Sequence, residues 1–172
     1  MSNVTISVDV MKVRADLNDL QRKKLEVAAK ILKRTAALYC GNKSLLPLWA
    51  AGVVTHGQPK SKNYVIGCTL EAKDANIKET SLDHLFRVTA TAEHILKNAA
   101  KLTEEEIEEI LLHRAITMRT TQTENNNNLK KAIKECTEKD NWQELYRAAK
   151  IEYEMQSTKW VDVKEDPART EQ

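Results

Sequence analysis

The longest regular pattern of apolar and polar positions lies between Asp16 and Gly41, and it predicts a long α-helix. Apolar residues recur there at three- and four-residue intervals, which places them on one helix face. The first strip consists of Leu25, Ala28, Leu32, Ala36 and Tyr39. A second strip, further round the helix, consists of Leu20, Val27, Ile31 and Leu38. Two such strips predict a helix that is buried over much of its circumference.

Alternation of apolar and polar residues at the N-terminus predicts a β-strand. The apolar positions are Val4, Ile6, Val8 and Val10, and the polar positions between them are Thr5, Ser7 and Asp9. A lone strand leaves its backbone groups unpaired, and the other short segment rich in strand formers runs from Tyr64 to Leu70. We therefore expect either a two-stranded ribbon between these segments or an N-terminal arm that pairs with a neighbouring subunit.

Helical spacing continues along the rest of the chain and predicts several shorter helices. The predicted helices start at Ser44 (ending at Gly57), at Thr80 or Ser81, at Thr103, at Leu129 (ending at Thr137), and near Asp140 and Gln143. Asp16 or Asn18 is the predicted N-cap of the long helix, and Gly41-Asn42 its C-cap. Thr103 and Glu106 have the spacing of a capping box. The polar stretch from Arg119 through four consecutive asparagines predicts a loop.

These patterns together predict a mainly α fold, of the all-α class. The expected architecture is a helical bundle of about six helices, with the two-stranded ribbon or exchanged N-terminal arm added to it. Residues 1–163 are expected to form a single helical domain, and a subdivision would fall near residues 124–128. Residues 164–172 are predicted to be a disordered tail because they are polar and charged. Trp160, just before this tail, is expected to dock on the domain or on a neighbour.

Composition supports a folded helical protein and argues against several other classes. Four glycines and three prolines are too few for the turns of a β-sandwich or barrel. The three cysteines are far apart and form no Cys-x-x-Cys motif, which indicates reduced thiols. The N-terminus does not resemble a signal peptide, and the near-apolar run at residues 45–54 is half the ~20 residues of a membrane helix. We therefore expect an intracellular, cytoplasmic protein without a membrane partner.

Charge is distributed unevenly along the chain. Residues 1–63 contain eleven Lys or Arg and four Asp or Glu, a net charge of +7. Residues 64–172 contain sixteen bases and twenty-one acids, a net charge of −5. Such an imbalance favours a polyanionic partner. It equally suits self-association, in which the basic face of one copy meets the acidic face of another.

A basic stripe on the long helix is the most specific candidate for a binding site. Lys23, Lys30 and Arg34 align between the two apolar strips and span three turns, ~16 Å at about 1.5 Å per residue. Cations at such intervals suit a row of phosphates, although an ordinary solvated helix face has the same pattern. With the flanking, loop and second-site cations included, the predicted nucleic-acid contacts are Lys23, Lys30, Arg34, Lys33, Arg22, Lys60, Lys62, Arg114 and Arg119.

The sequence contains no recognisable catalytic, metal or cofactor motif. Its four histidines form neither His-Glu-x-x-His nor the Glu-x-x-His of a di-iron bundle. The acidic run from Glu104 to Glu109 suits the positive end of a helix dipole and a solvated face. An enzyme would require a ligand pocket around a cysteine of depressed pKa, for which the sequence gives no sign. We therefore predict no catalytic residue, no metal, no cofactor and no enzymatic activity.

The expected function is therefore non-enzymatic binding of nucleic acid. The partner would be RNA in preference to DNA, contacted through its phosphate backbone without base specificity. A homo-oligomer would multiply the weak contact of each subunit, as in a viral coat, nucleocapsid or RNA-sequestering protein. The alternative is a helical protein–protein interaction or assembly module without nucleic acid, in which the basic stripe meets the acidic Glu104–Glu109 face of another copy.

Overall fold

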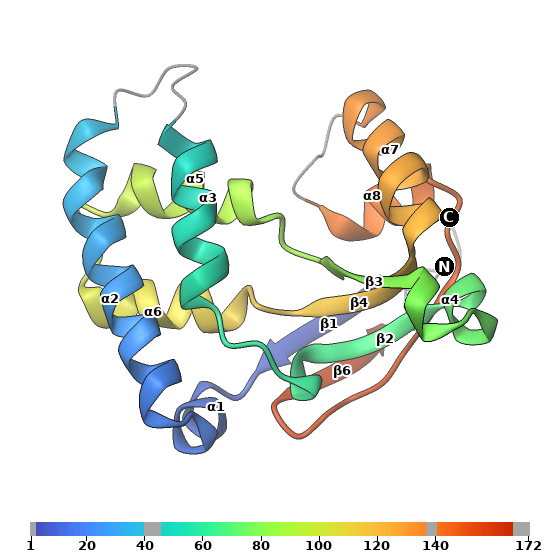
Figure 1. The fold of residues 1–172 in the computed structure, drawn as a ribbon, viewed down its shortest axis with the longest axis horizontal. Helices are drawn as coiled ribbons and strands as arrows, with labels where there is room; N and C mark the ends of the chain where they lie inside the picture. Colours follow the sequence, from blue (N-terminus) through green and yellow to red (C-terminus); the bar gives the residue numbers. More distant parts are fainter. Residues whose placement is uncertain (1–2, 40–45, 137–140, 167–172) are drawn as a thin grey trace. The chain divides into compact units, whose positions relative to one another are not determined.

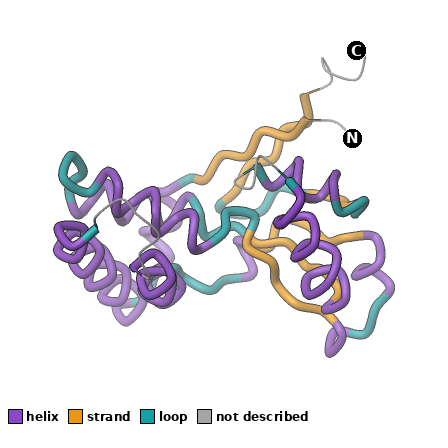
Figure 2. The backbone as a smooth tube through the Cα atoms, turned by 90° about the horizontal axis from the view of Figure 1, so that it is seen from above, coloured by secondary structure: helices purple, strands orange, loops and turns teal. Residues whose placement is uncertain are grey.

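The computed structural model describes residues 3–39, 46–136 and 141–166 (Figure 1). The chain divides into two compact units. Unit 1 is drawn from residues 1–8, 62–85 and 116–172, and unit 2 from residues 9–61 and 86–115. In Figure 2 the strands, drawn in orange, all belong to unit 1. The prediction of a single domain stays a prediction.

Unit 2 is helical in its regular elements. They are α1 (Val10–Asp16), α2 (Asp19–Thr35), the 3₁₀ turn η1 (Ala36–Leu38), α3 (Leu46–Gly57), α5 (Val88–Asn98) and α6 (Glu104–His113). Within this unit α2 packs against α3, α5 and α6, and α3 packs against α5. The first apolar strip of α2 supplies Leu25, Ala28 and Leu32 to the core, together with Ala29. The prediction that this strip is the buried face is confirmed.

Several predicted helix boundaries in unit 2 are confirmed by their caps. Asn18 and Gln21 form a capping box at the start of α2, so Asn18 and not Asp16 is the N-cap. Thr103 and Glu106 form the predicted capping box of α6. Helix α3 ends at Gly57 as expected. The long helix ends earlier than predicted, since α2 ends at Thr35 with Ala36 as its C-cap, and Gly41-Asn42 and Ser44 lie outside the described residues. Helix α1 was missed because Val10 continued the alternation of the preceding strand.

Unit 1 contains two β-sheets. The first pairs β1 (Asn3–Val8) with β6 (Val161–Asp166) in antiparallel register, with Val8 opposite Val161. The second has the order β3-β4-β2-β5, and its strands are β2 (Val65–Thr69), β3 (Thr80–His84), β4 (Thr117–Thr121) and β5 (Tyr153–Met155). The pair β2–β4 is parallel, and the other two pairs are antiparallel.

Unit 1 also contains short helical segments. They are η2 (Lys62–Tyr64), α4 (Leu70–Asp74), η3 (Ile77–Glu79), the π-helical turn η4 (Glu124–Leu129), α7 (Lys130–Glu135) and α8 (Trp142–Ala148). The asparagine run is therefore part of η4 and not a loop. The N-cap of α8 is Asn141, whose side chain accepts from the backbone of Gln143 and Glu144. Asp140 lies outside the described residues.

The prediction of an all-α helical bundle is wrong. The described residues form eight α-helices and six strands in two sheets, which is an α/β fold. The strand at the N-terminus was predicted correctly, but its partner is β6 and not the segment from Tyr64, because that segment already pairs with β4 and β5. The predicted helix start at Thr80 is instead strand β3, and the helix begins at Val88.

The C-terminal segment is more ordered than its composition predicted. Residues up to Asp166 belong to β6, so the expected disordered tail does not begin at Lys164. Residues 167–172 lie outside the described part of the chain. Trp160 docks as expected, within its own unit. Its exposed fraction is 4%, and its ring meets that of Tyr64 edge-on with centroids 5.1 Å apart.

Candidate functional site: the α2–α3 groove

The second apolar strip of α2 lies at the surface of unit 2, contrary to the prediction that it is buried. Leu20 is 63% exposed, Val27 45% and Ile31 36%. The helices that pack on α2 within unit 2 cover its first strip, and none of them covers the second. Single exposed apolar side chains are ordinary at a protein surface, but a contiguous group of them is typical of an interaction surface.

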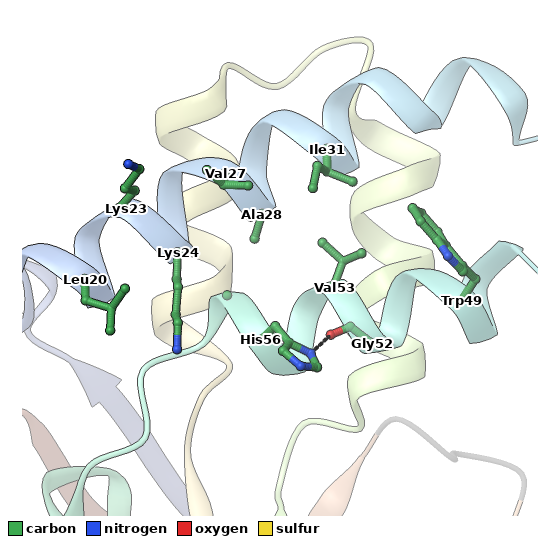
Figure 3. Close-up of a pocket in the computed structure, with 11 residues that line it drawn as sticks. Leu20, Lys23, Lys24, Val27, Ala28, Ile31, Trp49, Gly52, Val53 and His56 are labelled. Atoms are coloured by element: carbon green, nitrogen blue, oxygen red, sulfur yellow. Dashed lines mark hydrogen bonds between the residues drawn. The ribbon is translucent and has the colours of Figure 1, made fainter.

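These side chains form one wall of a groove between α2 and α3. The groove has a volume of about 600 Å³ and opens to solvent on one side (Figure 3). Its other wall comes from α3, where Trp49 is 52% exposed and Val53 is partly buried. The two helices run antiparallel, so that Leu20 lies at the same end as His56, and Ile31 at the same end as Trp49 (Figure 3).

Close packing at the base of the groove depends on small residues. A Cβ atom added at Gly57 would lie 2.4 Å from the Cβ of Ala28 and 3.5 Å from Cδ1 of Leu111. The backbones of α2 and α3 therefore approach one another here more closely than any larger residue at position 57 would allow. This approach sets the width of the groove above it.

The polar side chains that line the groove are basic or neutral. Lys23 and Lys24 stand at the end that Leu20 occupies, and His56 follows on α3. The Nδ1 atom of His56 lies 2.8 Å from the carbonyl oxygen of Gly52, so one ring nitrogen is already engaged. No Asp or Glu is among the residues that line this groove. The groove is thus an apolar channel with positive charge at one end.

Three of the predicted phosphate contacts, the stripe residue Lys30 and the flanking Arg22 and Lys33, are engaged within unit 2. Arg22 donates through Nε to the carbonyl oxygen of Leu17 at 3.0 Å. Lys33 donates to the carbonyl oxygen of Leu102, and Lys30 forms an ion pair with Glu26. The hydrogen bond between Lys30 and Glu26 raises the pKa of Lys30 and lowers the pKa of Glu26.

The acidic end of α6 lies on the flank of α2 that carries these cations. A hollow of about 530 Å³ is lined by Arg14, Arg22, Lys30, Glu26, Glu104, Glu105 and Glu108, among others. Arg14 and Glu108 form an ion pair there with an N–O distance of 2.7 Å. The basic stripe and the acidic run, which the sequence suggested for contacts between copies, therefore meet within one unit.

The remaining predicted contacts are spread over both units. Lys23 and Arg34 are exposed on α2, and Lys60 is exposed in the segment after α3. Arg114 places its guanidinium 5.7 Å from the ring centroid of Phe86. Lys62 and Arg119 are exposed, but they belong to unit 1. The nine cations therefore do not all belong to one compact unit.

The sequence reasoning missed the groove residues on α3. Trp49 and Val53 were assigned to a short helix without a role, and His56 was assigned to the basic loop that follows it. Their spacing of four and three residues, on a helix next to one with two apolar strips, is the signal that points to a shared surface. Lys24 was overlooked because it stands outside the stripe formed by Lys23 and Lys30.

Unit 1 holds a second cluster of titratable groups, around the carboxyl ends of β2 and β4. Glu124 is 2% exposed, and its Oε2 accepts from the hydroxyl of Thr69 at 2.6 Å and from the backbone of Thr121 at 2.8 Å. Asp83 accepts from the hydroxyl of Tyr146 at 2.9 Å. Because these carboxylates accept hydrogen bonds from neighbouring donors, we interpret the cluster as stabilising the fold of unit 1. It gives no basis for a catalytic assignment.

The carboxyl of Asp83 gives unit 1 a pH-dependent stability. Burial raises its pKa from 3.8 to about 6, although the Tyr146 hydrogen bond opposes this shift. Between these values the folded state binds more protons than the unfolded state, so stability falls as pH rises through the window. We expect Asp83→Asn to be as stable as the wild type near pH 4 and about 2 kcal/mol more stable near pH 7.

Urea unfolding followed by tryptophan fluorescence measures this difference. A Trp49→Phe background leaves Trp142 and Trp160, which both belong to unit 1. The exposed Asp74 in α4 supplies the control, since Asp74→Asn removes the same charge from the same unit. An Asp83→Asn protein whose stability follows the wild-type pH profile would contradict the assignment.

Neither a group of metal ligands nor a membrane-spanning helix is found in the described part of the chain. Residues 3–39, 46–136 and 141–166 contain no group of three or more His, Cys, Asp or Glu side chains arranged to hold a metal ion. No helix within these ranges has the length and apolar character needed to cross a membrane. Cys68 and Cys136 are free thiols, and Cys40 lies outside the described residues.

Comparison of the chain with protein families, curated proteins and solved structures finds no match. The functional argument therefore rests on the geometry of the groove.

Proposed function

We propose that unit 2 is a protein-interaction module that binds an apolar segment of a partner protein in the α2–α3 groove. The observation that carries this proposal is the second apolar strip of α2, which is exposed and faces Trp49 across the groove. Exposed tryptophan beside aliphatic side chains is typical of binding surfaces. The volume of about 600 Å³ accommodates several side chains of a partner.

The chemistry of the groove favours protein over nucleic acid. Surfaces that bind nucleic acid are polar and strongly positive, because they contact phosphates. The walls of this groove are apolar, and among the described residues that line it Trp49 is accompanied by no Phe, Tyr or second Trp. Arg22, Lys30 and Lys33 already donate hydrogen bonds inside unit 2, which reduces the number of donors that they can offer to a phosphate.

Phosphate-backbone binding remains a second candidate function because of four other cations. Lys23, Lys24, Arg34 and Lys60 are exposed, and none of them forms an ion pair with another described residue. Affinity that falls steeply with salt is the property that identifies this mode. Val27, which carries no charge, would contribute little to it. The two candidate functions therefore respond differently to the same substitution.

We expect Val27→Glu to abolish selection of peptides by the groove. A display library of random peptides of about 15 residues, panned against the wild-type protein, should yield binders whose affinity drops at least ~30-fold in this variant, because a buried carboxylate would replace an apolar contact. Leu38→Glu is the matched control, since Leu38 belongs to the same apolar strip, is 69% exposed and does not line the groove.

Peptides that bind both variants equally would place the contact elsewhere and contradict the proposal. A labelled single-stranded RNA, titrated against the same proteins at two salt concentrations, tests the second candidate. Salt-dependent binding that is equal for the Val27→Glu and Leu38→Glu proteins would favour phosphate contact over the groove.

A further inference from the structure

We infer that the occupant of the groove is a short amphipathic α-helix of another protein that carries carboxylates at one end of its apolar stripe. This inference rests on the proposed function and specifies the partner more closely. It draws on the shape of the groove, the position of its charges and the way α2 already packs against α6.

The dimensions of the groove suit a helix of about three turns. Leu20 and Ile31 are eleven residues apart on α2, which corresponds to ~16 Å at about 1.5 Å per residue. The groove is bounded by two antiparallel helices, and a third helix packs into such a channel by inserting side chains at intervals of three and four residues. The apolar side chains available to it are Leu20, Val27, Ile31, Trp49 and Val53.

Among the described residues that line the groove, the charged side chains lie at one end. Lys23 and Lys24 stand beside Leu20, whereas Ile31 and Trp49 close the other end without a charged neighbour among the lining residues (Figure 3). No lining residue is acidic. Carboxylates at one end of a partner helix would meet Lys23 and Lys24 when that end lies beside Leu20.

Helix α6 shows the same arrangement on the opposite flank of α2. Ile107 and Leu111 of α6 are fully buried in unit 2, and Glu108 on the same helix pairs with Arg14. Glu104 and Glu105 share a hollow with Arg22 and Lys30 of α2. One flank of α2 is thus covered by an acidic amphipathic helix, and the groove presents apolar side chains beside lysines on the other flank.

A second copy of the chain is a poorer occupant than another protein. A symmetric contact between two grooves would offer no carboxylate to Lys23 and Lys24, because the described residues that line the groove include no Asp or Glu. The acidic helix α6 of a second copy cannot enter the groove with its apolar face, because Ile107 and Leu111 are buried in its own unit. Charge therefore favours a different protein with an acidic helix.

Three synthetic peptides of about 15 residues test this inference. All three have the same content of Leu, Ala and Gln. The first carries two Glu at one end of a stripe of leucines at helical spacing, and the second carries two Lys at that end. In the third, the leucines are moved out of helical spacing. Binding is measured by fluorescence anisotropy with the intact protein. We expect the acidic peptide to bind about tenfold more tightly than the basic one, and the scrambled peptide not to bind.

Charge reversal on the protein should invert this preference. In the Lys23→Glu, Lys24→Glu double variant the basic peptide should bind more tightly than the acidic one. The control is the Lys12→Glu, Lys101→Glu double variant, in which both positions are exposed in unit 2 and lie outside the groove. It changes the net charge equally, and the acidic peptide should still bind more tightly than the basic one.

The outcomes separate this inference from the function on which it rests. Equal affinity for the acidic and basic peptides, with loss of both in Val27→Glu, would overturn the inference and leave the groove as a site for apolar segments. If neither helical peptide binds and the display library also yields no binder that depends on Val27, both the inference and the proposed function fail.

Discussion

Replacing Glu124 by alanine should destabilise unit 1 by about 4 kcal/mol, because it removes a buried carboxylate from the donors that surround it. Its Oε2 accepts from the Thr69 hydroxyl at 2.6 Å, the Thr121 backbone N–H at 2.8 Å and the Thr121 hydroxyl at 3.1 Å. Thr69 is fully buried, so its hydroxyl would lose its acceptor without gaining access to water. The cavity left by the side chain adds to this cost.

Glu124→Gln is the matched control for this prediction. The glutamine has nearly the same volume, and its carbonyl oxygen can still accept from Thr69 and Thr121, so we expect less than half of the loss. Urea unfolding in the Trp49→Phe background reports on unit 1 through Trp142 and Trp160. Equal stabilities for the alanine and glutamine variants would show that the hydrogen bonds at this position do not stabilise the unit.

The role of Glu124 could not be read from the sequence. It precedes four asparagines in a polar stretch that resembles a loop, and nothing local indicates that this residue is 2% exposed. Its partner Thr69 is 55 residues away along the chain. The parallel pairing of β2 with β4 brings the two strand ends together, and periodicity in one segment carries no information about such distant contacts.

The starts of α2 and α6 were predicted because their signals are local, whereas α1 was missed and α5 begins later than predicted. A capping box needs residues three apart, and an apolar face needs spacings of three and four. Both were present in the sequence and both appear in α2 and α6. Strand β3 of unit 1 was missed because its residues also fit a helix start. Thr80 and Asp83 have the spacing of a helix cap, yet Thr80 pairs with Thr121 across β3 and β4.

The groove illustrates a different limit of sequence reasoning. Spacing identified the second strip of α2 correctly as one face of a helix, but it could not tell whether a neighbour covers that face. Likewise, alignment of Lys30 and Arg34 suggested a free cationic stripe, although Lys30 pairs with Glu26 one turn away. The spacing therefore identified the right residues, but it predicted wrongly that the second apolar strip is buried and that Lys30 is unpaired.

Replacing Gly57 by alanine should destabilise unit 2 by about 3 kcal/mol and weaken binding in the groove. The new Cβ would lie 2.4 Å from the Cβ of Ala28, which is well inside the usual contact distance of ~3.5–4.0 Å between carbon atoms. Neither atom belongs to a flexible side chain, so the backbones of α2 and α3 must separate by about 1 Å or more. That separation moves Trp49 and Val53 away from Val27.

Gly52→Ala supplies a control in the same helix. A Cβ at this position has no atom within 4 Å, so the substitution should be neutral or stabilise α3 by up to ~1 kcal/mol through helix propensity. Urea unfolding read from Trp49, with Trp142 and Trp160 replaced by phenylalanine in every protein compared, follows unit 2. Suppose that Gly57→Ala were as stable as Gly52→Ala and bound the same peptides as the wild type. The close approach of Gly57 to Ala28 would then not determine the width of the groove, which other contacts of α3 would have to set.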